Sequence, residues 1–137
     1  LQSDSLEAVL LCPSNPWLSI DPILAMPALR AALARCRAPV VAVSPVVAGR
    51  AIKGPTAKLM QELGHEVSAV SVATHYAGLL DGFVLDAQDA ALAADITALG
   101  VRARVSDTMM RNDADKRRLA EEVLDFVDEL AVSGRHS

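Results

Sequence analysis

The stretch Pro39-Val40-Val41-Ala42-Val43, which Ser44 and Pro45 follow, decides the fold class. A short β-branched run bounded by proline on both sides is typical of a strand that is buried on both faces. Similar apolar runs predict strands over residues 7–12 (EAVLLC), 81–86 (DGFVLD) and 101–105. Arg102 and Arg104 alternate in the last run, which favours an edge strand with one wet face.

The segments between these strands have helical character. We expect helices over residues 21–35, 55–63, 68–76 and 89–99, with Asp21 as the cap and Pro22 at the first helical position of the first helix. A last helix has one apolar face, and Asn112 with Asp115 resembles a capping box at its start; the face is Leu119, Val123, Phe126, Val127 and Leu130. Strands that alternate with helices imply a mainly parallel, Rossmann-like sheet flanked by helices.

Composition excludes several classes of function. The 137 residues suffice for one domain, residues 1–137, and a net charge of −4 with 3% aromatic residues argues against nucleic-acid binding. Charge or proline interrupts every apolar stretch before about 18 residues, so we predict no membrane span. The two cysteines fit neither a zinc pattern nor a disulfide framework, and we expect Cys12 to be buried. Such sparing use of cysteine fits a cytoplasmic protein.

Ligands of open parallel sheets bind beyond the carboxyl ends of the strands, which selects loops that begin at Pro13, Ser44, Ala87 and Ser106. The first loop reads Pro13-Ser14-Asn15-Pro16-Trp17-Leu18-Ser19 and leads into a helix, whose first backbone N–H groups attract phosphate. Ser14, Asn15 and Ser19 could add neutral donors. The same residues equally suit turns and caps, so both interpretations stay open.

The second and fourth loops contain further candidate residues. Gly49 and Gly54 permit close approach of the backbone to a ligand, and Lys53 could neutralise a phosphate. The spacing of these residues does not match a Walker A loop. We interpret Arg50 as a surface charge. In the fourth loop, Asp107 and Thr108 could contact a ligand or shape the turn. Mixed charges over residues 111–118 suggest a solvated helix face, and the sequence shows no metal-ligand spacing.

These motifs together resemble one family, the 2-phospho-L-lactate transferases of the CofD type. The resemblance rests on three runs, and their order and gaps agree over nearly the whole chain. They are Pro13-Ser14-Asn15-Pro16 with Ser19-Ile20 and Pro22-Ile23-Leu24, then residues 38–45 with Lys53-Gly54-Pro55 and Lys58, and then Asp107-Thr108-Met109-Met110.

The resemblance implies an activity and its partners. Such enzymes transfer a phospholactate or phosphoenolpyruvate group from a guanosine-diphosphate-linked donor to the hydroxyl of a deazaflavin, release GMP, act in coenzyme F-420 biosynthesis, and are homodimers that need Mg²⁺. Carried over by position, Ser14, Asn15, Ser19, Ser44 and Pro45 would contact the nucleotide or its phosphates. Lys53 and Gly54 would line the donor side, with Asp107 and Thr108 as further candidates. The resemblance assigns no catalytic residue.

The chain also departs from that family. The family begins with a Gly-rich strand, loop and helix and with acidic residues that bind magnesium, and neither occurs here. We therefore expect the chain to be the C-terminal part of a larger fold and to be inactive alone. Cys12 replaces a usual glycine, as does Ala28. Two alternatives are a regulatory protein of the same superfamily that binds uridine nucleotide-sugars, and a fragment that packs against a partner chain.

Overall fold

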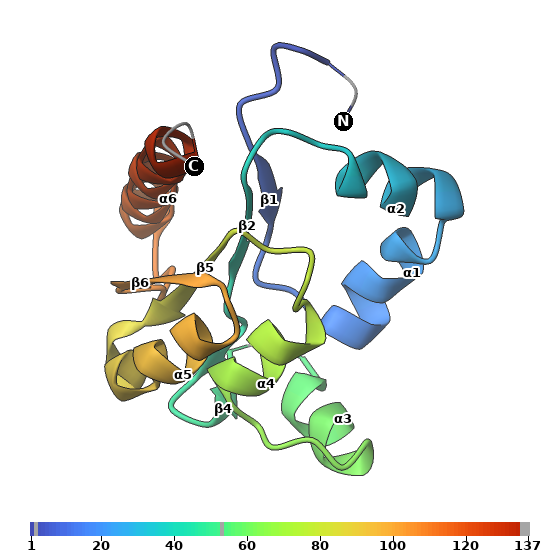
Figure 1. Ribbon diagram of the computed structural model, residues 1–137. Helices are drawn as coiled ribbons and strands as arrows, with labels where there is room; N and C mark the ends of the chain where they lie inside the picture. The colour runs from blue at the N-terminus through green and yellow to red at the C-terminus, as the bar shows by residue number, and fades with distance from the viewer. Residues whose placement is uncertain (2, 53, 135–137) are drawn as a thin grey trace.

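The computed structural model describes residues 1, 3–52 and 54–134, and its centre is a parallel sheet (Figure 1). The sheet has the order β1-β2-β5-β6, formed by Val9–Leu11, Val40–Val43, Gly82–Asp86 and Arg102–Ser106. Every neighbouring pair is parallel, with Val9 beside Val40, Val41 beside Gly82, and Gly82 beside Arg102. The predicted α/β fold and all four predicted strands are thus confirmed.

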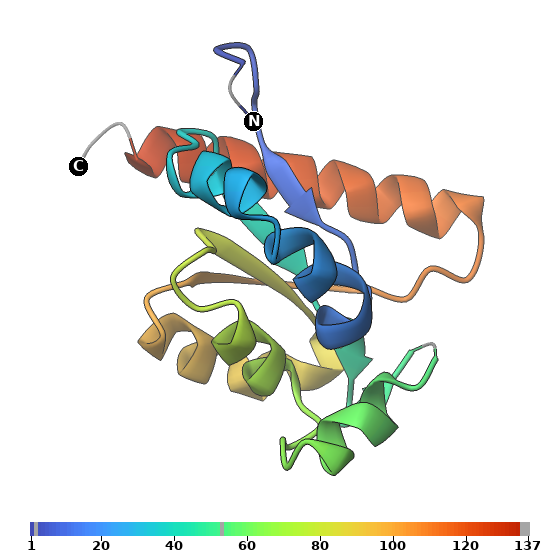
Figure 2. The same cartoon turned by 90° about the vertical axis from the view of Figure 1, so that its right-hand side faces the viewer.

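Helices cover both faces of the sheet, which makes three layers (Figures 1 and 2). One face packs against α1 (Asp21–Leu24), α2 (Pro27–Ala34), α3 (Thr56–Glu62), α4 (Ala69–His75) and α5 (Ala93–Ala98). A short 3₁₀ segment, η2 (Ala87–Leu92), which is kinked at Asp89, leads into α5. The long helix α6 (Asp113–Gly134) crosses the other face.

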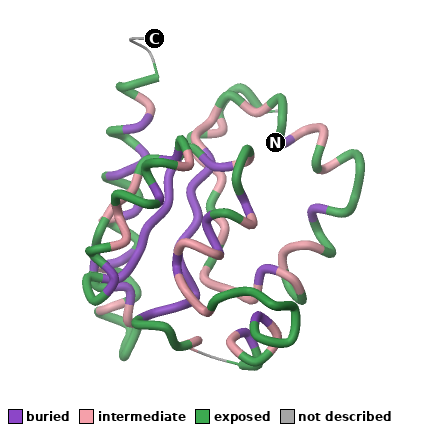
Figure 3. Tube along the Cα trace, turned by 60° about the horizontal axis from the view of Figure 1, so that its bottom comes forward, coloured by how far each residue is buried: buried purple, intermediate pink, exposed green. Residues whose placement is uncertain are grey.

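Alternation along the strands divides the buried residues into two clusters, and the purple segments of Figure 3 follow the strands. Val40, Ala42, Phe83 and Leu85 point to the many-helix side. Val41, Val43 and Val84 point to α6, where they meet the five apolar residues that form its predicted face. A strand buried on both faces needs apolar residues at every position, which explains the continuous run in β2.

The start of α6 follows the predicted cap with one change. The backbone N–H of Asp115 donates to the Asn112 side chain at 2.8 Å, as a capping box requires. The Asp115 carboxylate accepts from the backbone N–H of Arg111 at 2.9 Å, one residue earlier than expected. The edge position of β6 is confirmed, but α6 shields part of its arginine face, because Arg104 lies 5.1 Å over the Phe126 ring and pairs with Glu129.

The predicted helix over residues 21–35 is wrong as a single element. Helical turns begin earlier, at η1 (Pro16–Ile20), with Asn15 rather than Asp21 as the cap and Pro16 at the first position. The chain then breaks at Met26, which is extended (φ −71°, ψ 112°). Pro27 explains the break, because its ring disfavours a helical conformation in the residue before it.

Two smaller expectations also change. The second loop contains a short antiparallel hairpin of β3 (Val46–Val47) and β4 (Arg50–Ala51). Cys12 is exposed rather than buried. Among the described residues, no single helix has both the length and the apolar character to cross a membrane; the bent pair Pro16–Leu24 and Pro27–Ala34 meets the length and composition test only across an 86° break.

Candidate functional site

Three of the loops at the carboxyl ends of the strands enclose one cleft of about 450 Å³. The residues that line it come from the first, second and fourth loops and from the start of α6; they are Pro13, Ser14, Asn15, Leu18, Ser19, Pro45, Ile52, Gly54, Pro55, Thr56, Thr108, Met109, Met110, Arg111 and Lys116. Hollows of about 740 and 630 Å³ lie near the amino ends of the strands, but they are remote from these loops. Ligands of open parallel sheets bind at the carboxyl ends, so the smaller cleft is the candidate site.

The first loop contributes an unpaired donor. The Asn15 Oδ1 atom accepts hydrogen bonds from the backbone N–H groups of Trp17 at 3.0 Å and Leu18 at 3.1 Å. These are the helix-start donors expected to face a phosphate, and Asn15 already occupies them. Its own Nδ2 is buried and has no acceptor among the described residues. An unsatisfied buried donor costs about 1–3 kcal/mol, so it marks a place where a ligand can supply the missing acceptor.

The second loop forms another wall of the cleft. Pro45 and Gly54 line the cleft, and Gly54 has φ +69°, which favours glycine. Ser44 is fully buried, and its hydroxyl donates to the Val46 carbonyl and accepts from the Val46 N–H. It therefore stabilises the conformation of the loop without lining the cleft. Lys53 lies outside the described residues.

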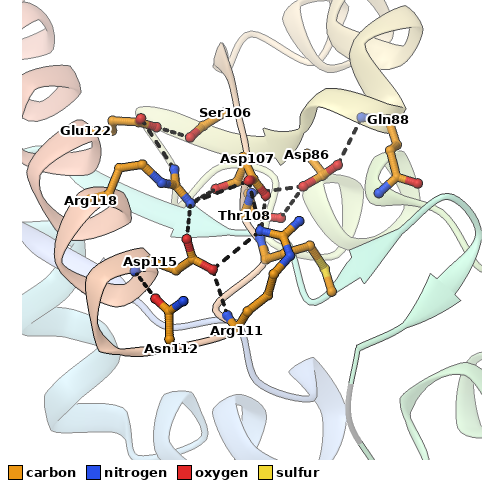
Figure 4. A network of polar contacts seen from close by, with 11 residues as sticks. Asp86, Gln88, Ser106, Asp107, Thr108, Arg111, Asn112, Asp115, Arg118 and Glu122 are labelled. Carbon is orange, nitrogen blue, oxygen red and sulfur yellow. Dashed lines mark hydrogen bonds and ion pairs between the residues drawn. The ribbon is translucent and has the colours of Figure 1, made fainter.

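The fourth loop is fastened to the end of β5 through Asp86 (Figure 4). The Asp86 carboxylate accepts from the Thr108 N–H at 2.9 Å, the Thr108 hydroxyl at 3.0 Å and the Gln88 N–H at 2.9 Å. Burial alone would raise the pKa of Asp86, but the hydrogen bonds from Gln88 and Thr108 hold this pKa below its usual value. Thr108 is buried beside the cleft, whereas Asp107 is exposed and outside it.

Ion pairs join the fourth loop to the start of α6 (Figure 4). Arg111 Nη1 lies 3.0 Å from Asp107 and 3.4 Å from Asp115, and Arg118 also contacts both carboxylates. The hydrogen bond from Arg111 lowers the pKa of Asp107 most, and the Met109 N–H adds to the effect. Arg111 is largely exposed, and such pairs are weak, so its guanidinium can also meet a ligand.

The structure therefore brings most of the predicted residues together. Ser14, Asn15, Ser19, Pro45, Gly54 and Thr108 line the cleft, whereas Ser44 and Asp107 do not. Sequence reasoning missed Arg111 and Lys116 as lining residues, because the mixed-charge run was interpreted as a solvated face. It also missed Asp86, although its position at the carboxyl end of a buried strand was a signal.

The lining favours an anionic ligand. Arg111 and Lys116 are the charged members of the described lining, and Ser14, Asn15, Ser19, Thr56 and Thr108 contribute neutral polar groups. Within the described residues, no group of three or more His, Cys, Asp or Glu side chains could hold a metal ion. The described lining of the cleft also contains no Asp or Glu, the residues that would offer Mg²⁺ a carboxylate ligand.

Fold and cleft together define an α/β protein with a candidate ligand site at the carboxyl edge of a parallel sheet. Comparison with known families gives a more specific result, because the model of the family described as 2-phospho-L-lactate transferase CofD matches residues 4–127. The chain belongs to this family.

Individual relatives agree with the family assignment. The chain is 43% identical over 120 residues to a 2-phospho-L-lactate transferase of Methanosarcina acetivorans, covering 88% of this chain and 38% of the relative. It is 36% identical over 127 residues to a phosphoenolpyruvate transferase of Streptomyces griseus, covering 92% of this chain and 40% of the relative. The chain thus spans about two fifths of the length of these relatives.

Proposed function

We propose that this chain supplies part of the donor site of a transferase in coenzyme F-420 biosynthesis. The enzyme would move a phospholactate or phosphoenolpyruvate group from a guanosine-diphosphate-linked donor to the hydroxyl of a deazaflavin. The observation that carries the proposal is the buried Asn15 Nδ2, which lacks an acceptor among the described residues and belongs to a residue that lines the cleft. A phosphate or carboxylate oxygen of the donor would supply that acceptor.

The reaction itself is a displacement at phosphorus. The acceptor hydroxyl oxygen forms a bond to the phosphorus that carries the three-carbon acid, the P–O bond to the bridging oxygen breaks, GMP leaves, and the hydroxyl proton is lost. Residues of this chain would act by holding the donor and by neutralising its charge, through Asn15, Arg111 and Lys116. We assign no acid or base to the chain.

The remaining parts of the proposal rest on the family. We expect the 137 residues alone not to complete the transfer, since the relatives are much longer. We expect magnesium from the resemblance, with its ligands in the part of the family's fold that lies outside this chain. A homodimer and a cytoplasmic location are further expectations from the resemblance and from the sequence.

Calorimetric titration with GDP, with a UDP-sugar as the competitor and magnesium present, tests the proposal. It is performed on the chain and on the longest natural protein that contains it. The critical variant is Asn15→Asp, which retains the Oδ1 acceptor for Trp17 and Leu18 but replaces the Nδ2 donor with a carboxylate oxygen. Asp95→Asn, an exposed change on α5, is the control.

We expect GDP binding that Asn15→Asp weakens about tenfold or more, because a lost donor and an added like charge act together. Asp95→Asn should leave the affinity unchanged. A preference for the UDP-sugar would instead support the regulatory alternative. Absence of GDP binding in both proteins, or an unchanged affinity in Asn15→Asp, would refute the proposal.

A further inference from the structure

The third loop, which follows β5, contributes none of the residues that line the cleft, yet one buried carboxylate lies just before it, at the end of β5, and a second lies within it. Asp86 is 2% exposed and Asp89 is 7% exposed. Burying a charge is costly unless hydrogen bonds compensate it, so the partners of both carboxylates show what they stabilise.

Asp89 holds the hairpin of the second loop. Both of its oxygens accept from the backbone N–H of Ala48, at 3.2 and 3.0 Å. Ala48 is the first of the two turn residues between β3 and β4 and has φ +49°, a left-handed conformation that is unfavourable for alanine. The carboxylate therefore stabilises a turn that its own sequence disfavours.

The hairpin transmits this constraint to the cleft. Val46 pairs with Ala51 and Val47 with Arg50, and the next residue, Ile52, donates its N–H to the Pro45 carbonyl at 3.1 Å. Ile52 and Pro45 both line the cleft. The turn that Asp89 holds is thus only a few residues away from one wall of the site.

Asp86 performs the same task for the wall that the fourth loop forms. Its carboxylate binds the N–H and hydroxyl of Thr108, and the next three residues, Met109, Met110 and Arg111, line the cleft. A separate hollow is lined by residues of the hairpin together with Gln88 and Met109. It shares Ile52 and Met109 with the cleft, which shows that the hairpin and the fourth loop are neighbours.

We infer that Asp86 and Asp89 are positioning residues, which hold the hairpin and the fourth loop at the separation that admits the ligand. This inference rests on the proposed function, because it concerns the same cleft. Neither carboxylate touches the ligand; each acts through a backbone group of the wall that it fastens. Substitution of each carboxylate by an amide should have different effects at positions 86 and 89, and this difference makes the inference testable.

An Asn at position 89 keeps one oxygen for the Ala48 N–H, since both Asp89 oxygens share that donor. An Asn at position 86 cannot keep both sets of contacts, because one Asp86 oxygen accepts from Gln88 and the other accepts from Thr108. Asp86→Asn should consequently weaken GDP binding about tenfold or more, whereas Asp89→Asn should change it about twofold or less. Asp89→Ala should weaken GDP binding strongly, because it removes both acceptors of the Ala48 N–H. Adding Ala48→Gly to that variant should restore part of the affinity, because glycine adopts positive φ at little cost.

The experiment combines GDP titration with amide NMR spectra of the same variants, at a temperature where thermal scans show each one folded. Asp125→Asn, an exposed change on α6, is the matched control. We expect Asp86→Asn to shift the Met109 and Arg111 amides, and Asp89→Ala to shift the Ile52 amide. A merely stabilising role would lower the melting temperature without moving these amides or the affinity.

The two proposals fail in different ways. If the parent binds no GDP, the proposed function fails, and the amide shifts still decide whether the carboxylates hold the walls. Parent-like affinity in Asp86→Asn, or unmoved Ile52 and Met109 amides in both severe variants, would overturn the positioning role.

Discussion

His75 Nε2 lies 2.8 Å from Asp21 Oδ1 and joins the end of α4 to the start of α1. The His75 ring also lies 4.7 Å from the Trp17 ring and 5.4 Å from the Tyr76 ring. Trp17 follows Asn15 by two residues, so this contact fastens the first loop of the cleft to the body of the protein.

We predict that His75→Ala lowers the free energy of unfolding by about 1–2 kcal/mol, because it removes a hydrogen bond and two ring contacts. Urea denaturation measures the change. His65→Ala is the matched comparison, since His65 is exposed and only stacks on Trp17, at 5.2 Å. An equal loss in the two variants would show that the Asp21 contact contributes nothing.

Gly82 lies where β5 passes under α6. A Cβ atom there would stand 2.7 Å from Phe126 Cε1 and 2.8 Å from Leu130 Cδ1, and both side chains are buried. Gly82→Ala should therefore destabilise the protein by about 1–3 kcal/mol through overpacking. Gly134→Ala, with open space around its Cβ, should be nearly neutral in the same thermal scan. A neutral Gly82→Ala would mean that α6 can move away from the sheet easily.

The lowered pKa of Asp86 predicts a dependence of stability on pH. In the unfolded chain this carboxyl titrates near its ordinary pKa of about 3.9, whereas in the folded chain it stays ionised to lower pH. Its contribution is thus complete above the unfolded pKa and is lost as pH falls through the folded pKa. The difference in unfolding free energy between the parent and Asp86→Asn should shrink between about pH 5 and pH 3. A difference that stays constant over this range would contradict the assigned hydrogen bonds.

Arg111 should bind the anionic part of the ligand, because it lines the cleft beside Lys116. We predict that Arg111→Gln weakens GDP binding about threefold to thirtyfold, and that added salt weakens the parent more than the variant. Arg117→Gln is the control, since Arg117 is exposed on α6 and outside the cleft. Equal effects of the two substitutions would indicate only a general influence of net charge.

Strong local patterns made most of the fold predictable. The continuous apolar run of β2 and the one-sided apolar face of α6 each allow a single packing solution, and the structure confirms both. The region after Asn15 was predicted less well. Pro22 and Pro27 both suit the start of a helix, and in the structure each lies in the first turn of its own helix, so the chain breaks between them at Met26. Asp21, the expected cap, binds His75 instead, a contact across 54 residues that no local pattern reveals.

The candidate site divides in the same way. Residues that lie directly after strands, such as Ser14, Asn15 and Thr108, were predictable from the rule for parallel sheets. Ser44 obeys the same rule but turns inward to bond Val46, because the following Pro45 and hairpin redirect the chain. Asp89 could not be identified from its position alone, since its role depends on the left-handed Ala48 in another loop.

The most direct test of the central claim is an amide NMR titration of the isotope-labelled chain with GDP. The account predicts that the shifts concentrate on the cleft, at Ser14, Asn15, Gly54, Thr108 and Arg111, and that Asn15→Asp strongly reduces them at the same GDP concentration. Shifts confined to the hollows at the amino ends of the strands, or a larger response to a UDP-sugar than to GDP, would contradict it.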